Sequence, residues 1–257
     1  MTGDRLAIIL AGVLGSTIGS FLNVCILRWP RDQSVVRPRS RCPGCGQGIV
    51  WYDNIPIVSW LLLRGRCRHC RAPISIQYPL VEAGTAAIWA FMAWRYLPDF
   101  EALRAAVFFT ILLGIALTDA REYIIPDEFS IGGLVIGLLF SLPGGFPEIS
   151  RALLGAATGF VLLWAVGAVG TRIFKEDAMG GGDIKMMAMV GAFVGWQGVL
   201  LTVFLGALLG TVIFVPLSLI GGKRLVPFGV FLALGAATAF LAGPALVGWY
   251  KSFVLQP

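Results

Sequence analysis

The chain has 257 residues, of which 57% are hydrophobic and only 13% charged, whereas a soluble domain has roughly 25% charged residues. This composition excludes an ordinary soluble globular protein. The formal net charge of +6 follows from the retention of basic residues on the cytoplasmic side of a membrane, so it requires no nucleic-acid partner.

The apolar residues form stretches of about 20 along the whole chain, enough for each to cross a bilayer as a helix. The first stretch is longer than the roughly 7–15 apolar residues of a secretory signal, so we expect it to remain as a span. Gln197 and Gly198 leave little room for a turn, and a tilted or partly re-entrant segment is the alternative for the span before them. The sequence predicts an all-α polytopic membrane protein with about eight transmembrane helices: residues 6–28, 79–97, 103–120, 129–146, 151–173, 184–197, 199–220 and 228–248.

Basic residues are distributed unevenly among the connecting segments. Residues 28–78, 119–128, 172–185 and 221–227 hold 15 of the 20 lysines and arginines. Because such loops stay on the cytoplasmic side, we expect four loops in the cytoplasm and both termini on the opposite side of the membrane. The first loop, of about fifty residues, is expected to form a small cytoplasmic domain.

Two Cys-x2-Cys pairs lie in this first loop, Cys42-Pro-Gly-Cys45 and Cys67-Arg-His-Cys70. Their spacing is typical of one tetrahedral Zn²⁺ held by four thiolates in a zinc-ribbon-like domain. Two disulfides are the alternative, but a reducing cytoplasm disfavours them. Reduced or redox-active thiols remain a further possibility.

His69 is the only histidine of the chain and lies inside the second cysteine pair. A Ser-His-Asp triad, a Cys-His dyad and a His-Glu-x-x-His metalloprotease are therefore not expected. A zinc ribbon near nine arginines could also bind nucleic acid. We expect none, because Trp51, Tyr52 and Trp60 fit the membrane interface equally well.

Acidic residues within membrane helices cost roughly 2.5–3.5 kcal/mol each on insertion, and three of them call for an explanation. Glu82 lies in the second expected span, Asp119 ends the third and Asp183 begins the sixth. Asp127 and Glu128 are more simply explained as charges at a helix N-terminus, where they interact favourably with the macrodipole.

Asp119 and Asp183 are expected at the cytoplasmic ends of two helices, where they can face each other. Two close carboxyl groups share a proton, so that one activates water and the other polarises a carbonyl, as in aspartic peptidases. The missing side chains of Gly180 and Gly182 would let an extended peptide or another helix approach closely, and Lys185 could tune the local charge. A helix cap at Asp183 and an ion or proton site remain alternatives on these residues alone.

The chain resembles the bacterial type IV prepilin peptidases of the GxGD aspartic peptidase group. This family resemblance spans nearly the whole chain. In one departure, Arg121 stands where many members have a second acidic residue. The matching motifs are Gly19-Ser-Phe-Leu-Asn-Val-Cys25, the Cys42–Cys70 loop with Trp51-Tyr-Asp-Asn-Ile-Pro56, Tyr78-Pro-Leu-Val-Glu82, Asp119 with Ile125-Pro-Asp127, Gly180-Gly-Gly-Asp183-Ile-Lys185 and Val226-Pro-Phe-Gly229.

The resemblance implies that Asp119 and Asp183 are the catalytic pair of an endopeptidase. Such an enzyme cleaves the basic leader of type IV prepilins or secretion pseudopilins on the cytoplasmic side. It also implies N-methylation of the new N-terminus with S-adenosylmethionine, associated with the cysteine loop. Gly19, Asn23 and Glu82 are candidate supporting residues for methylation, although Glu82 would equally serve to neutralise an arginine.

We therefore expect two domains. Residues 1–78 would form the first helix and the methylation-associated loop, and residues 79–257 the membrane peptidase. An ion-coupled transporter using Asp119 and Asp183 is the main alternative, although no second Gly-Gly-Gly-Asp motif suggests an inverted repeat. A zinc-ribbon membrane anchor would leave both aspartates unexplained.

Overall fold

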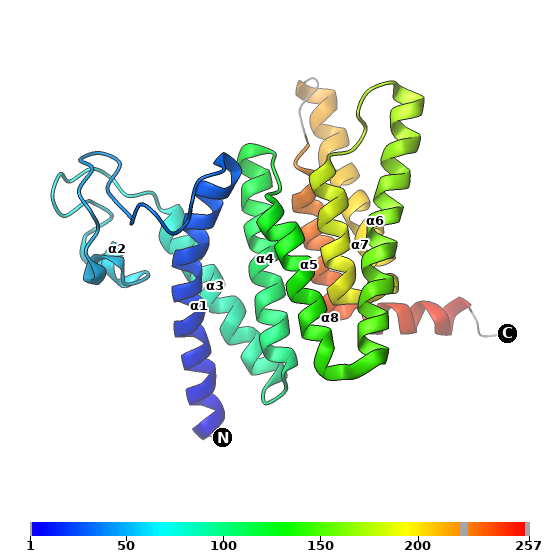
Figure 1. Ribbon diagram of the computed structural model, residues 1–257, viewed down its shortest axis with the longest axis horizontal. Coiled ribbons are helices and arrows are strands. Elements are labelled where there is room, and N and C mark those ends of the chain that lie inside the picture. Colours follow the sequence, from blue (N-terminus) through cyan, green and yellow to red (C-terminus); the bar gives the residue numbers. More distant parts are fainter. Residues whose placement is uncertain (1, 222–225, 255–257) are drawn as a thin grey trace. The chain divides into compact units, whose positions relative to one another are not determined.

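The computed structural model describes residues 2–221 and 226–254, which are mostly helical (Figure 1). Within these ranges there is no β-strand, and only two isolated bridges occur, between Arg41 and Gly48 and between Arg66 and Pro73. In the same ranges, three short 3₁₀ helices accompany the α-helices: η1 (Trp29–Arg31), η2 (Trp51–Asn54) and η3 (Leu142–Gly144). The α-helices are α1 (Thr2–Arg28), α2 (Val58–Leu62), α3 (Gln77–Tyr96), α4 (Glu101–Glu122), α5 (Asp127–Ser141), α6 (Gly145–Phe174), α7 (Gly181–Gly221) and α8 (Phe228–Val254).

Five stretches of the described chain are long and apolar enough to cross a membrane. The predicted all-helical, multi-pass fold is thus confirmed. The count of eight crossings stays a prediction, because α3 is not among the five stretches and one stretch contains both α5 and α6. The five are Asp4–Arg31, Glu101–Glu122, Asp127–Phe174, Gly181–Phe214 and Phe228–Phe253.

By packing, the chain forms two compact units, Met1–Thr110 and Ile111–Pro257. The expected boundary at residue 78 divides the chain by role rather than by packing, and it stays a prediction. The last of the four expected basic loops contains Lys223 and Arg224, which lie outside the described residues.

In the first unit, glycines allow α1 to lie directly against α3. A Cβ atom on Gly19 would come within 2.8 Å of the Glu82 Cα atom, and one on Gly15 within 2.8 Å of the Thr85 carbonyl oxygen. The indole N–H of Trp89 in α3 donates a hydrogen bond to the Thr110 hydroxyl of α4 at 3.0 Å. The close approach of α1 to α3 buries Glu82 and Thr85 between these two helices.

In the second unit, α6 and the first part of α7 approach each other even more closely. A Cβ atom on Gly191 would lie 2.0 Å from the Gly155 carbonyl oxygen, and one on Gly159 would lie 2.0 Å from the Met187 carbonyl oxygen. Backbone thus packs on backbone, as small residues permit in membrane helix pairs. This contact fixes the start of α7, which carries Asp183.

Gly195 divides α7 into two helices that run in opposite directions (Figure 1). Its φ of 71° and ψ of 176° are non-helical and favour glycine. Near the beginning of α7, Asp183 interacts electrostatically with Asp119, which is bonded to the first turn of α8. Further along α7, Gly210 lies close to Phe228 and Phe231, which also belong to the start of α8. A straight helix would separate residues 183 and 210 by about 40 Å, so the chain must reverse. The two expected segments 184–197 and 199–220 correspond to these two helices.

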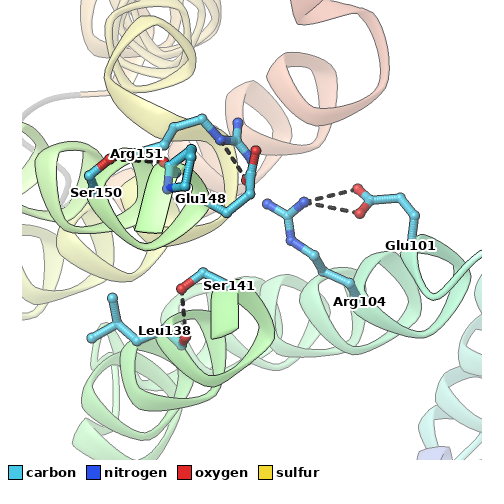
Figure 2. A network of polar contacts seen from close by, with 8 residues as sticks. Glu101, Arg104, Leu138, Ser141, Glu148, Ser150 and Arg151 are labelled. Carbon is cyan, nitrogen blue, oxygen red and sulfur yellow. Dashed lines mark hydrogen bonds and ion pairs between the residues drawn. The ribbon is translucent and has the colours of Figure 1, made fainter. Parts of the chain in front are cut away.

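Several charged and hydroxyl side chains at helix ends find partners within their own helix. Figure 2 shows Arg151 paired with Glu148 at 3.0 Å in α6, Arg104 paired with Glu101 at 3.0 Å in α4, and the Ser141 hydroxyl bonded to the Leu138 carbonyl at 2.7 Å in α5. Glu101 and Glu148 also lie in first turns, where the helix dipole favours a negative charge. These acidic residues are explained by local structure.

The α6–α7 contact predicts that Gly191→Ala destabilises the protein. The added methyl group would meet backbone atoms that cannot move aside, and overpacking of this kind costs about 1–3 kcal/mol. Gly132→Ala in α5 is the control, because a Cβ atom there has no neighbour within 4 Å. Thermal unfolding in detergent, followed by tryptophan fluorescence, should give a lower Tm for Gly191→Ala alone, and equal Tm values for the two variants would refute the packing argument.

Candidate functional site

The four loop cysteines form one cluster in the first unit. The Sγ atoms of Cys42, Cys45, Cys67 and Cys70 lie within 4.8 Å of one another. All are free thiols, and the Cys42 and Cys70 sulfurs are 3.7 Å apart, so they form no disulfide. The predicted grouping of these side chains is confirmed, and the cluster can hold a metal ion.

The two Cys-x2-Cys segments have the same backbone hydrogen bonds, 25 residues apart. The Cys42 N–H donates to the Gln47 carbonyl and the Cys67 N–H to the Ala72 carbonyl, both at 2.9 Å. The Gly46 and Arg71 N–H groups donate back to the carbonyls of Cys42 and Cys67 at 2.8 and 3.0 Å. Each segment is therefore a tight hairpin that presents two thiols to a common centre.

Backbone N–H groups act to lower the pKa values of two thiols in the cluster, Cys67 and Cys70, but the net shifts of the two are opposite. The N–H groups of Cys70 and His69 lower the pKa of the Cys67 thiol to about 6. The Ala72 N–H lowers the pKa of Cys70, but desolvation and hydrogen bonds with the other three sulfurs outweigh it and raise this pKa to about 11. Crowded sulfurs thus compete for protons, and a bound cation would relieve this competition by taking the thiolates as ligands.

Glu82 is buried in α3 and has uncharged partners. Its Oε2 atom accepts a hydrogen bond from the Ile57 N–H at 2.7 Å, and the Ser20 hydroxyl also bonds to it. An arginine is therefore not what satisfies this carboxylate. The other candidate supporting residue, Asn23, donates to the Tyr78 carbonyl at 3.1 Å, while its buried Oδ1 has no protein partner.

In the second unit, Asp119 lies buried near the end of α4. Its Oδ2 atom accepts a hydrogen bond from the Val230 N–H at 3.3 Å, in the first turn of α8. A Cβ atom on the preceding Gly229 would lie 2.9 Å from the same oxygen. Asp119 thus occupies the N-terminus of α8, where exposed backbone N–H groups and the helix dipole favour an anion.

Asp183 lies in the first turn of α7, close enough to Asp119 for the two charges to interact. Its Oδ1 atom is buried without a hydrogen-bond partner in the protein. A Cβ atom on Gly180 would lie 3.2 Å from the Asp183 Oδ2 atom. The structure therefore brings together the two aspartates that the sequence singled out.

Ile125 fills the space beside the two aspartates. Its side chain lies 3.0 Å from where a Cβ atom of Gly182 would stand and 2.8 Å from the corresponding position on Gly229. The roles of Ile125, Gly229 and Val230 were not predicted from the sequence. The only signal was that Ile125 and Gly229 stand in the motifs around Pro126 and Pro227, whereas Val230 follows the last of these motifs.

Lys185 lies near Asp183 in sequence, but its ammonium group binds a different carboxylate. The Nζ atom lies 2.7 and 2.9 Å from the two carboxylate oxygens of Asp127 in α5. This exposed ion pair links the starts of α5 and α7. The Lys185 ammonium group therefore forms its ion pair with Asp127 and not with Asp183.

Fold and site together define a helical, multi-pass membrane protein with two carboxyl groups close enough to interact electrostatically. The bacterial peptidase A24 N-terminal domain matches residues 13–96, and the type IV leader peptidase family matches residues 106–215. No solved structure matches the chain significantly.

Curated relatives extend this match to most of the chain. A prepilin leader peptidase/N-methyltransferase of Aeromonas hydrophila is 36% identical over 91% of this chain and 90% of its own length. The protein of the same name from Pseudomonas putida is 35% identical over 92% and 91%. Another from Myxococcus xanthus is 41% identical over 82% of this chain, which spans 63% of that relative. The chain belongs to the type IV leader peptidase family, as its motifs predicted.

Proposed function

We propose that this protein is an aspartic endopeptidase that removes the basic leader of type IV prepilins or pseudopilins and then methylates the new N-terminus, with S-adenosylmethionine as methyl donor. The observation that carries the peptidase assignment is the meeting of Asp119 and Asp183 at the start of α8. The names of the curated relatives support both activities.

The geometry of the pair suits a shared-proton mechanism. Asp119 has one oxygen held by the Val230 N–H, whereas the Oδ1 atom of Asp183 has no protein partner. In the proposed reaction the ionised carboxylate takes a proton from water, which attacks the scissile carbonyl, and the protonated partner polarises the carbonyl oxygen. Gly180 has no side chain and would leave room for an extended peptide beside the pair, whereas the space beside Gly182 is taken by the Ile125 side chain.

The proposed location is the bacterial inner membrane, with the aspartates facing the cytoplasm. Its support is the excess of lysine and arginine in the loops that adjoin both aspartates and the cysteine cluster. A basic leader would remain on this side for the same electrostatic reason, so that enzyme and cleavage site would meet there.

The comparisons give no support to the alternative of an ion-coupled transporter. Asp127, the nearby carboxylate that would compete for the first catalytic position, is exposed and paired with Lys185. This leaves Asp119 as the buried partner of Asp183.

For the cysteine cluster we propose one structural Zn²⁺ bound by Cys42, Cys45, Cys67 and Cys70. Four sulfur ligands from two tight hairpins match the tetrahedral thiolate sites of zinc ribbons. The loop has short helices and two isolated bridges as its regular structure, so the metal would supply much of its folding energy.

Asp119→Asn and Asp183→Asn should each abolish leader cleavage, with the protein still inserted and folded. An amide keeps the shape of the side chain but cannot exchange the shared proton. Asp127→Asn is the matched control and should lose only a small part of the activity. The measurement is mass spectrometry of a prepilin-like peptide, and an indispensable Asp127 with a dispensable Asp119 would overturn the assignment.

Gly229→Ala should reduce cleavage strongly and leave the fold intact, because the new methyl group would press on the Asp119 carboxylate at about 2.9 Å. Gly248→Ala in the same helix is the control, since a Cβ atom there has no neighbour within 4 Å. Cleavage rates of the two variants decide the matter. Wild-type activity in Gly229→Ala would show that the position of this carboxylate is not critical.

Elemental analysis of purified protein should find one Zn²⁺ per chain. Cys67→Ser should lose the metal, whereas Cys25→Ser should keep it, because Cys25 is buried in α1 outside the cluster. We expect cleavage to survive in Cys67→Ser better than methylation does. Metal-free wild-type protein with four freely titrating thiols would contradict the zinc proposal.

A further inference from the structure

The short helix α2, in the loop that carries the cysteines, has an exposed apolar face. Val58, Leu61 and Leu62 have 49%, 61% and 79% of their surface exposed, and their spacing places them on one side of the helix. Ser59 and Trp60 instead line a cavity within the first unit. The helix is thus apolar on its outer side as well as packed on its inner side, which is typical of a helix in contact with a second apolar phase.

Glu82 fixes the level at which α2 begins relative to the membrane helices. Its Oε2 atom accepts a hydrogen bond at 2.7 Å from the N–H of Ile57, directly before α2, and the Ser20 hydroxyl of α1 bonds to the same carboxylate. Ile57 has a φ of 63°, which is rare for a β-branched residue, so the Glu82 bond holds the chain in a sharp turn. The first residue of α2 therefore lies close to the level of Ser20.

Ser20 lies well within the length of α1. This helix has 27 residues and is therefore about 40 Å long, which equals the thickness of a bilayer with its headgroups. Ser20 is about 12 Å along the axis from Arg28, where α1 ends, whereas each headgroup region is about 5–8 Å thick. The start of α2 thus lies near the boundary between headgroups and hydrocarbon, and in Figure 1 α2 is lower than the upper end of α1.

The loop around α2 is strongly basic. Residues 28–78 contain nine arginines but only two acidic residues, Asp32 and Asp53, and Asp53 is paired with Arg68 at 2.8 Å. Arg64 lies just past the end of α2 and is exposed. An arginine stem can lie along an apolar surface while its guanidinium group stays among polar groups, and this group matches the geometry of a phosphate. An apolar face next to arginine therefore complements an anionic phospholipid.

We infer that the apolar face of α2 inserts into the bilayer surface at which α1 ends, with Arg64 bound to the phosphate of an anionic lipid. Segments in this boundary bind through both buried apolar area and attraction to anionic lipids. A protein partner fits less well, because three aliphatic side chains cover far less than the roughly 1,200–2,000 Å² that a stable protein interface buries in total. This docking does not depend on the proposed reactions.

The photoreactive residue p-benzoylphenylalanine in place of Leu62 tests this contact in the full chain, reconstituted in vesicles of phosphatidylcholine and phosphatidylglycerol. After irradiation, mass spectrometry of the intact protein should find chains that carry one phospholipid. The control has the same residue in place of Val36, which is 77% exposed. Arg28 donates to the carbonyls of Ser34 and Pro38 at 2.8 and 2.9 Å, which holds Val36 at the end of α1, so its lipid adducts should be several times fewer.

Vesicles of phosphatidylcholine alone should lower the adduct yield at Leu62, and Arg64→Gln in the mixed vesicles should lower it similarly. Equal yields at Leu62 and Val36 would overturn the docking, as would crosslinks from Leu62 to a second copy or to another part of the chain in place of lipid. Equal yields in the two lipid compositions would overturn the role of Arg64.

If the crosslinking variants misfold, judged by gel filtration and thermal unfolding, hydroxyl-radical footprinting of the wild type in the mixed vesicles decides instead. The radicals should oxidise Val36 and spare Leu61 and Leu62, because lipid covers only the face of α2. Oxidation of all three residues would contradict the docking.

Discussion

A carboxylate buried in an apolar helical bundle needs a backbone donor, a shared proton or a cation nearby, because burial of an uncompensated charge is strongly unfavourable. Asp119 meets this requirement with the first turn of α8, whose Val230 N–H binds its Oδ2 atom. Asp183 lies within the field of Asp119 and has an oxygen without a protein partner. The proposed peptidase mechanism requires the pair to share one proton, and two carboxyl groups that interact in this way favour such a state.

Glycines make this arrangement possible. Backbone contact at Gly155 and Gly191 fixes the first part of α7 against α6, and the reversal at Gly195 returns the chain to α8. Gly229 then leaves room for the Asp119 carboxylate at the start of α8. None of these contacts has space for a methyl group. The position of the aspartates therefore depends on glycine at these sites.

Much of this arrangement could be predicted from the sequence, because its signals are local. Long apolar stretches indicate helices, acidic residues stand out within them, and two Cys-x2-Cys pairs indicate a common ligand centre. The partners of these groups could not be predicted. Lys185 binds Asp127 rather than influencing Asp183 directly, and Glu82 binds the Ile57 N–H rather than an arginine. Such pairings depend on how the helices pack, and neither the charges nor the residue spacing in the sequence determine that packing.

The proposed function assigns cleavage to a carboxylate pair in the second unit and methylation to the first unit, which holds the cysteine cluster. The most direct test uses a synthetic peptide that already begins at the mature N-terminus, incubated with the Asp183→Asn variant and labelled S-adenosylmethionine. Since this peptide needs no cleavage, its methylation should proceed at close to the wild-type rate, while the full-length precursor stays uncut. Loss of methylation of the mature peptide in folded Asp183→Asn protein would show that the two reactions share one site and would contradict the account.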